Sequence, residues 1–343
     1  MNQYQYIIQP LVKTSAAIAV KIILACILLL NSLQVSARDP VFSQFYAAPI
    51  YLNPAFAGST NCSRMAFSYR HWRGIDNFHA LNFSYDIYSE RLQGGLGIIA
   101  TSDLSNFDMT RTNISGMYSY HLRATENINI HFAVQAGYIR NDSRLKPDDF
   151  TDPAEPLPDN MAGHDLDLSA GILLFSDRVY GGIAAHHMND PNMSLLENEE
   201  FKPGIKYTAH LGLYLEPSQT AARPGERSPY FFSPNFIYQR ETYHQHVSAG
   251  MYFGTKPVML GTWLRHHRFR SQQENQNDTE SQNTLVFLAG INMGDYRIGY
   301  SYDYPVGNSG FSNILTVHEI SLAWRFNCPN RNIGGRIINY PRF

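Results

Sequence analysis

The stretch from Phe78 to Tyr88, FHALNFSYDIY, alternates between apolar and polar side chains with a period of two. In an extended chain, side chains that alternate in sequence lie on opposite faces. One face then carries the large apolar side chains of Leu81, Phe83, Tyr85 and Ile87. The other face carries the small or polar side chains of Ala80, Asn82, Ser84 and Asp86. The same division recurs in residues 64–72 and 127–139. This pattern predicts two-faced β-strands.

Three features favour lipid rather than water against the apolar faces. The segments are about 9 to 12 residues long, the length that a tilted strand needs to cross a bilayer. Tyrosine and tryptophan gather near strand ends, as at Tyr88, Trp263 and Trp324, where an interfacial girdle is expected. The opposite faces carry Gly, Ser, Asn, Gln and Arg, which suit a polar lumen better than a dry core.

The connections between these segments indicate a closed barrel. We predict strands near residues 63–73, 77–88, 92–102, 108–122, 127–140, 165–176, 178–188, 205–216, 229–240, 243–254, 257–266, 283–294, 296–304 and 315–326. Long polar connections such as 141–164 alternate with tight turns such as 89–91, as extracellular loops alternate with periplasmic turns; residues 217–228 are an exception. Backbone amides in lipid must all be paired, so the sequence predicts an all-β fold, a transmembrane antiparallel β-barrel of about 14 strands.

Shorter segments flank the barrel, which we assign to residues 62–326. Residues 1–37 combine a basic start, an apolar run from Ile22 to Leu30 and small residues at 35–37, which predicts a signal peptide. Residues 38–61 form an N-terminal motif that lies in the periplasm or plugs the lumen. Residues 327–343 form a short periplasmic tail. The predicted localisation is the outer membrane.

The composition and the histidines argue against several function classes. A formal net charge of −2 offers no basic patch for nucleic acid. His244 and His246 share a strand face, but two imidazoles without a further ligand make an incomplete metal site, so neither a metal site nor a cofactor is predicted. No motif brings a serine or aspartate together with an oriented histidine, so we expect no enzyme.

The N-terminal motif, RDPVFSQFYAAPIYLNPAFAG from Arg38 to Gly58, fits neither a helix nor a regular strand. Its three prolines interrupt any helix or sheet ladder, and its five aromatic residues supply apolar area that is not expected to remain in water. Two interpretations remain open: a plug in the mouth of the barrel, and a docking surface for a periplasmic partner.

The same residues closely resemble a known family. The motif positions are Asp39, Pro40, Phe42, Ser43, Gln44, Phe45, Tyr46, Pro49, Leu52, Asn53, Pro54 and Gly58. Further landmarks follow in order along the chain, including residues 180–183, 297–303 and 318–322. The sequence is similar to the PorP/SprF family of type IX secretion and gliding-motility outer-membrane proteins of Bacteroidota.

The resemblance implies a non-enzymatic barrel that contacts outer-membrane lipid and lipopolysaccharide and serves protein secretion. The implied partners are PorK/PorN-type ring lipoproteins with a peptidoglycan-binding PorE-like protein, or a cognate secreted adhesin bound through its C-terminal domain. The sequence does not choose between these roles. The alternative function is an outer-membrane porin or small-solute diffusion channel, which requires an open lumen.

Two residue pairs near the strand ends carry further expectations. In a closed barrel the first strand pairs with the last, so Cys62 and Cys328 lie at one rim, where they either form a disulfide or remain as separate thiols. His318 and Glu319 begin the last strand, either as polar strand-end residues or as a contact with a plug or a partner chain.

Overall fold

The structure is a computed structural model. It describes residues 39–60, 62–73, 78–105, 109–143, 161–195, 200–216, 230–242, 244–270, 279–306 and 316–328. The predicted signal peptide lies outside the described residues, as do the connection 217–228 and the tail beyond Cys328. Within the described residues, no helix is long and apolar enough to span a membrane.

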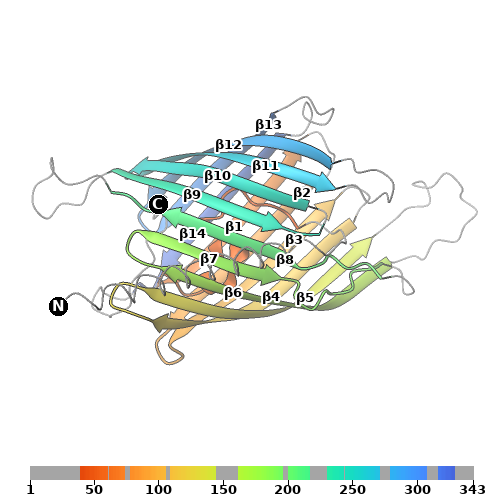
Figure 1. Cartoon of the computed structure of the whole chain (residues 1–343), viewed down its shortest axis with the longest axis horizontal. Coiled ribbons are helices and arrows are strands. Elements are labelled where there is room, and N and C mark those ends of the chain that lie inside the picture. Colours follow the sequence, from red (N-terminus) through yellow and green to blue (C-terminus); the bar gives the residue numbers. More distant parts are fainter. Residues whose placement is uncertain are drawn as a thin grey trace, which may run out of the picture. The chain divides into compact units, whose positions relative to one another are not determined.

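The described residues form fourteen strands: β1 (Ser63–Arg73), β2 (His79–Ser89), β3 (Gly94–Ser105), β4 (Met109–Arg123), β5 (Asn129–Ser143), β6 (Met161–Phe175), β7 (Val179–His186), β8 (Lys206–Leu213), β9 (Tyr230–Arg240), β10 (His244–Thr255), β11 (Val258–Arg270), β12 (Thr279–Met293), β13 (Tyr296–Val306) and β14 (Thr316–Phe326). Each strand pairs antiparallel with its sequence neighbours, and β1 pairs with β14, so the sheet closes on itself (Figure 1). The predicted barrel is confirmed.

The two faces of the strands are divided as the alternation predicts. On β2, Asn82, Ser84 and Asp86 are buried inside the barrel, whereas Phe83 between them is exposed on the outer wall. On β5, Val134 is 64% exposed while His131 and Gln135 are buried. Large exposed apolar side chains cover the outside of a closed barrel only where lipid surrounds it.

The strands reach further at one end than the sequence predicts. β6 begins at Met161 and β12 at Thr279, although both starts were expected to lie in loops. We call this end, which carries the long connections, the outer rim. The opposite end carries the short turns, such as residues 90–93 and 294–295, and we call it the inner rim. At this end β5 stays paired with β6 as far as Ser143 and Met161, and β11 with β12 as far as Arg270 and Thr279. These strands are therefore longer than a bilayer crossing requires.

Two short helices lie inside the ring of strands. α2 (Pro49–Leu52) and the 3₁₀ helix η1 (Pro54–Phe56) each begin with a proline, which is tolerated where a helix starts. The segment that contains them is red in Figure 1, and its side chains share one hydrophobic core with inward side chains of the barrel wall. The barrel lumen is therefore occupied by the N-terminal motif.

Candidate functional site: the luminal plug

Residues 39–60, called the plug below, bring all twelve predicted motif positions into the lumen. Asp39 and Pro40 are partly buried. The other ten are buried: Phe42, Ser43, Gln44, Phe45, Tyr46, Pro49, Leu52, Asn53, Pro54 and Gly58. These ten residues are thus packed inside the barrel and are not presented to solvent.

The plug does not stay at the periplasmic side, where an even strand count would place it. Gly58 lies beside Gly95 at the inner start of β3. Asp39 bonds to Lys206, the first residue of β8 at the outer rim. The plug therefore runs along the lumen from the inner rim towards the outer rim, because polar partners for its backbone and side chains line that whole path.

A buried ionic network holds the plug at Ser43 and Gln44. Arg70 on β1 contacts Asp303 on β13 at 2.7 Å and Glu319 on β14 at 2.8 Å. Arg265 on β11 contacts the same Asp303 oxygen at 3.2 Å. Two cations thus face two carboxylates, and this balance is what makes burial of four charged side chains tolerable.

Ser43 of the plug occupies the centre of this network. Its hydroxyl donates to Asp303 and accepts from Arg70 at 2.9 Å and Arg265 at 3.1 Å. The backbone N–H groups of Ser43 and Gln44 donate to the two carboxylate oxygens of Glu319, at 2.7 and 3.0 Å. Charge-assisted bonds of this kind are stronger than neutral ones, so the network fixes the plug backbone as well as one side chain.

Asn53 holds the plug against the opposite wall. Its side-chain amide donates to the carbonyl oxygens of Ile172 on β6 and Ile183 on β7, at 3.1 and 3.2 Å. Its amide oxygen accepts from Ala55 N–H at 2.9 Å and so caps η1. One fully buried side chain therefore both starts a helix and binds two wall strands.

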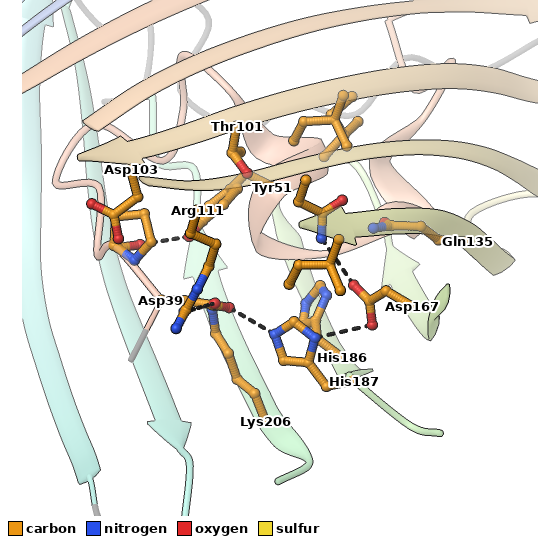
Figure 2. A pocket seen from close by; sticks show the side chains of 15 residues that line it. Asp39, Tyr51, Thr101, Asp103, Arg111, Gln135, Asp167, His186, His187 and Lys206 are labelled. Carbon is orange, nitrogen blue, oxygen red and sulfur yellow. Dashed lines mark hydrogen bonds and ion pairs between the residues drawn. The ribbon is translucent and has the colours of Figure 1, made fainter. Parts of the chain in front are cut away.

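The outer end of the plug is held through Asp39 (Figure 2). Its Oδ2 lies 2.8 Å from Lys206 Nζ and 3.1 Å from Nε2 of His187, the residue after β7. The other ring nitrogen of His187 contacts Asp167 on β6 at 3.0 Å, and Arg111 on β4 is 3.6 Å from Asp39 Oδ1. These side chains line a small cavity of about 40 Å³.

The charges around Asp39 set its protonation state and that of His187. Burial alone would raise the pKa of Asp39, but Lys206, His187 and Arg111 hold that pKa well below its usual value. Burial alone would lower the pKa of His187, but Asp39 and Asp167 raise it to about 10. Asp39 is therefore a carboxylate and His187 an imidazolium at neutral pH.

The inner end of the plug depends on a close backbone approach and a second buried ion pair. Gly58 has φ +67°, and a Cβ atom on the facing Gly95 would overlap the carbonyl group of Ala57. The Gly58 N–H donates to Asp86 at 2.9 Å, and Asp86 also pairs with Arg64 at 2.8 Å. Glycine on both sides lets the plug lie directly on the wall.

Aromatic side chains fill the space between these polar contacts. The Phe45 ring lies 5.2 Å from that of Trp263 and 5.9 Å from that of Tyr252. The prediction that Trp263 belongs to the interfacial girdle was wrong, since its side chain is buried in the lumen. Phe56 stacks on His210 at 5.2 Å. Edge and stacked contacts at these distances add to the free energy gained by burying the rings, so the plug is packed as a core is packed.

His318 and Glu319, expected as a polar pair, point to opposite faces of β14. Glu319 is fully buried and binds the plug. His318 lies on the outer wall, where its ring nitrogen is 2.8 Å from the Tyr300 hydroxyl. The pleat separates the two side chains, and only Glu319 makes the plug contact that the sequence left as one alternative.

Cys62 and Cys328 form a disulfide at the inner rim, with Cα atoms 4.3 Å apart. Cys62 directly precedes β1 and Cys328 follows β14. Since β1 and β14 are paired along their whole length, the bond joins the two strands at which the barrel closes.

Several wall residues that hold the plug were not predicted as site residues, among them Asp303, Arg265, Lys206, His187 and Asp86. His187 is an exception to strand alternation, because it follows β7 with φ +57° and is buried beside His186. The inward position of the others could have been read from strand alternation. Their mutual contacts could not, because they depend on which strands the closed barrel sets beside the plug.

The chain has distant likenesses to several outer-membrane proteins. Among solved structures it is similar to the Acinetobacter baumannii outer membrane protein Omp33, at 8% identity over 78% of this chain and 100% of that chain, with a TM-score of 0.41. It is also similar to a Pseudomonas aeruginosa FadL homologue, at 8% identity over 82% and 94%, with a TM-score of 0.45. A KdgM porin matches at 7% identity over 77% and 99%, with a TM-score of 0.36. These likenesses are too distant to bear on function.

No curated protein matches the chain in sequence. The family model for the type IX secretion system membrane protein PorP/SprF matches residues 34–324, which include the plug and nearly the whole barrel. The chain therefore belongs to the PorP/SprF family of type IX secretion system membrane proteins and is an outer-membrane β-barrel of that family.

Proposed function

We propose that this protein is a non-enzymatic scaffold of the type IX secretion system. Its barrel anchors it in the outer membrane, and its inner rim binds either ring lipoproteins or the C-terminal domain of a secreted adhesin. The observation that carries this proposal is the plug, which occupies the lumen and is held along its length by the barrel wall.

The plug argues against a diffusion channel. Solute flow would require the segment to leave a lumen in which it has charge-assisted bonds to Glu319, Asp303 and Lys206. Leaving a buried polar group without its hydrogen-bond partner costs about 1–3 kcal/mol, and more for a charged group, and several such contacts would have to open together. A barrel closed in this way serves better as a rigid frame than as a pore.

The polar groups of the lumen are also poorly suited to catalysis. The Ser43 hydroxyl is the only serine oxygen of the plug that contacts charged side chains among the described residues, and it is bonded to two arginines and a carboxylate. None of its hydrogen bonds among the described residues is to a histidine that could act as a base. This arrangement supports a structural role for the network.

The burial of the plug leaves the inner rim as the surface that faces the periplasm. Its described turns are exposed and carry charged side chains, including Glu90, Glu126 and Lys256. The motif that looked like a docking segment contributes indirectly, by holding the wall strands from which these turns project.

Site-specific photocrosslinking in native membranes tests the proposal. A photoreactive residue placed at Glu90, Glu126 or Lys256 is expected to capture a ring lipoprotein or a secreted adhesin, identified by mass spectrometry. The matched control is Asn189, an exposed residue beyond β7 at the outer rim. Capture at Asn189 alone, or no capture at the three inner positions, would overturn the scaffold proposal.

Conductance measurements in planar bilayers address the alternative separately. The wild-type protein is expected to show no large stable open channel. Steady conductance of the size given by an open porin would favour the diffusion channel instead. The identity of the captured protein then distinguishes the two scaffold roles, since ring lipoproteins indicate the core machinery and an adhesin indicates a dedicated export partner.

A further inference from the structure

Three histidine side chains point into the lumen from the β10–β11 hairpin, close to the outer rim. His244 and His246 lie two residues apart on β10 and so share a face. His267 on β11 is paired directly with His246. All three are buried inside the barrel, at 8%, 3% and 6% exposure.

Their ring nitrogens are already close enough to share one ion. His244 Nε2 and His267 Nδ1 are 3.1 Å apart, and one nitrogen from each of the three rings lies within 4.8 Å of the others. Two nitrogens bound to one tetrahedral Zn²⁺ at about 2.0–2.1 Å stand about 3.3–3.4 Å apart. The first pair is hydrogen-bonded in the structure and would open by about 0.2–0.3 Å to reach that spacing. The third ring needs a displacement of at most about 1.5 Å, which a side-chain rotation supplies.

We propose that His244, His246 and His267 form a Zn²⁺ site. Neutral imidazoles suit Zn²⁺ and related transition cations, whereas Mg²⁺ and Ca²⁺ prefer oxygen ligands. A cavity of about 30 Å³ borders His246, and this is enough room for a water molecule as the fourth ligand.

The surroundings are compatible with a bound dication. On the inward face of β11, Arg265 lies two residues before His267, and its charge is balanced by Asp303 at 3.2 Å. The same cavity touches Ser43 and Phe45 of the plug. An occupied site would therefore join the outer ends of β10 and β11 beside the plug.

His266 provides a matched control for His267. It is the adjacent residue on β11 but points to the opposite face, where its Nδ1 contacts Asn283 at 2.8 Å. His266→Gln changes the same chemical group within one residue of the site without removing a ligand. His267→Gln removes one ligand and keeps a polar side chain of similar length.

The test uses the mature protein in detergent without a histidine tag, stripped of metal by a chelator. Zn²⁺ binding is measured by competition with a chromophoric chelator, and Co²⁺ is used as a spectroscopic probe. We expect one Zn²⁺ per chain, a visible Co²⁺ spectrum of tetrahedral type, and little competition from Ca²⁺ or Mg²⁺. His267→Gln should weaken Zn²⁺ binding by at least about 100-fold, since even residues that only orient ligands cost 10–100-fold.

Three results would overturn the proposal. They are the absence of stoichiometric Zn²⁺ binding by the wild-type protein, an octahedral Co²⁺ spectrum, and equal loss of affinity in His266→Gln and His267→Gln. Heat-modifiable migration on a gel confirms that each variant is a folded barrel. If His267→Gln does not fold, His244→Gln replaces it, and the wild-type Co²⁺ spectrum requires no variant.

Discussion

Arg70 and Glu319 face each other across the β1–β14 pair at which the barrel closes, and their side chains form an ion pair of 2.8 Å inside the lumen. The same Glu319 carboxylate accepts the backbone N–H groups of Ser43 and Gln44. One contact therefore joins the barrel closure to the position of the plug. Each end of the plug has its own contacts, so the parts of this arrangement can be tested separately.

Glu319→Gln should loosen the plug while leaving the barrel folded. The change removes one of two carboxylates that balance Arg70 and Arg265, and breaking a buried ion pair costs about 3–5 kcal/mol. Hydrogen exchange of residues 42–46 should accelerate by about 100-fold or more. His318→Gln alters the neighbouring side chain on the outer wall and should leave the exchange unchanged. Equal protection in Glu319→Gln and the wild type would show that this network does not hold the plug.

Gly95→Val should displace the inner end of the plug. A side chain at this position would overlap the backbone of Ala57, whereas Gly116 on the outer wall has open space around its Cβ position. Overpacking costs about 1–3 kcal/mol, so peptides covering residues 55–60 should exchange faster in Gly95→Val. Gly116→Val is the control and should behave as the wild type; a similar effect of both substitutions would point to general strand destabilisation instead.

The contacts of Asp39 with Lys206, His187 and Arg111, called the outer anchor, hold the outer end of the plug. The stability of this anchor should depend on pH in two separate ranges. The pKa of Asp39 is depressed by its cationic neighbours, so its contribution is present above about 3.9 and is lost as the pH falls through the lower folded value. The pKa of His187 is raised to about 10, so its contribution is complete below about 6.5 and is lost as the pH rises towards 10. The anchor should therefore be most stable between about pH 4 and 6.5.

Hydrogen exchange of residues 39–42, corrected for the intrinsic effect of pH, measures this anchor. In the wild type, protection should fall at acid pH and again at alkaline pH. Asp39→Asn should abolish the acid dependence, the acid limb, and His187→Gln should abolish the alkaline dependence, the alkaline limb. His266→Gln, which changes a histidine on the outer wall, should keep both limbs. A wild-type profile that is flat from pH 6.5 to 10 would contradict the assigned role of His187.

Removal of the Cys62–Cys328 disulfide should lower the stability of the barrel. The bond closes a loop with a sequence separation of 266, for which the chain-entropy model gives about 5.6 kcal/mol. The double variant Cys62→Ser, Cys328→Ser should unfold at lower temperature and lower denaturant concentration than the oxidised protein, as followed by gel migration. Identical unfolding of the two proteins would show that strand pairing between β1 and β14 is sufficient without the bond.

The sequence by itself determined the strands, their number and the face that each side chain occupies. These follow from a period of two, which is a local property: the alternation from Phe78 to Tyr88 is enough to place Phe83 outside and Asn82 inside. The predicted strand ends were less accurate at the outer rim, because pairing there continues past the length fixed by the bilayer.

Only the tertiary structure decided what the inward side chains do. Arg70, Arg265, Asp303 and Glu319 come from four strands, β1, β11, β13 and β14, and closure of the barrel sets them around Ser43. The third imidazole beside His244 and His246 likewise comes from His267, through the register of β10 with β11. A sequence pattern states which face a residue occupies, but strand register and barrel closure determine which residues meet, and the plug could be placed only once those contacts were known.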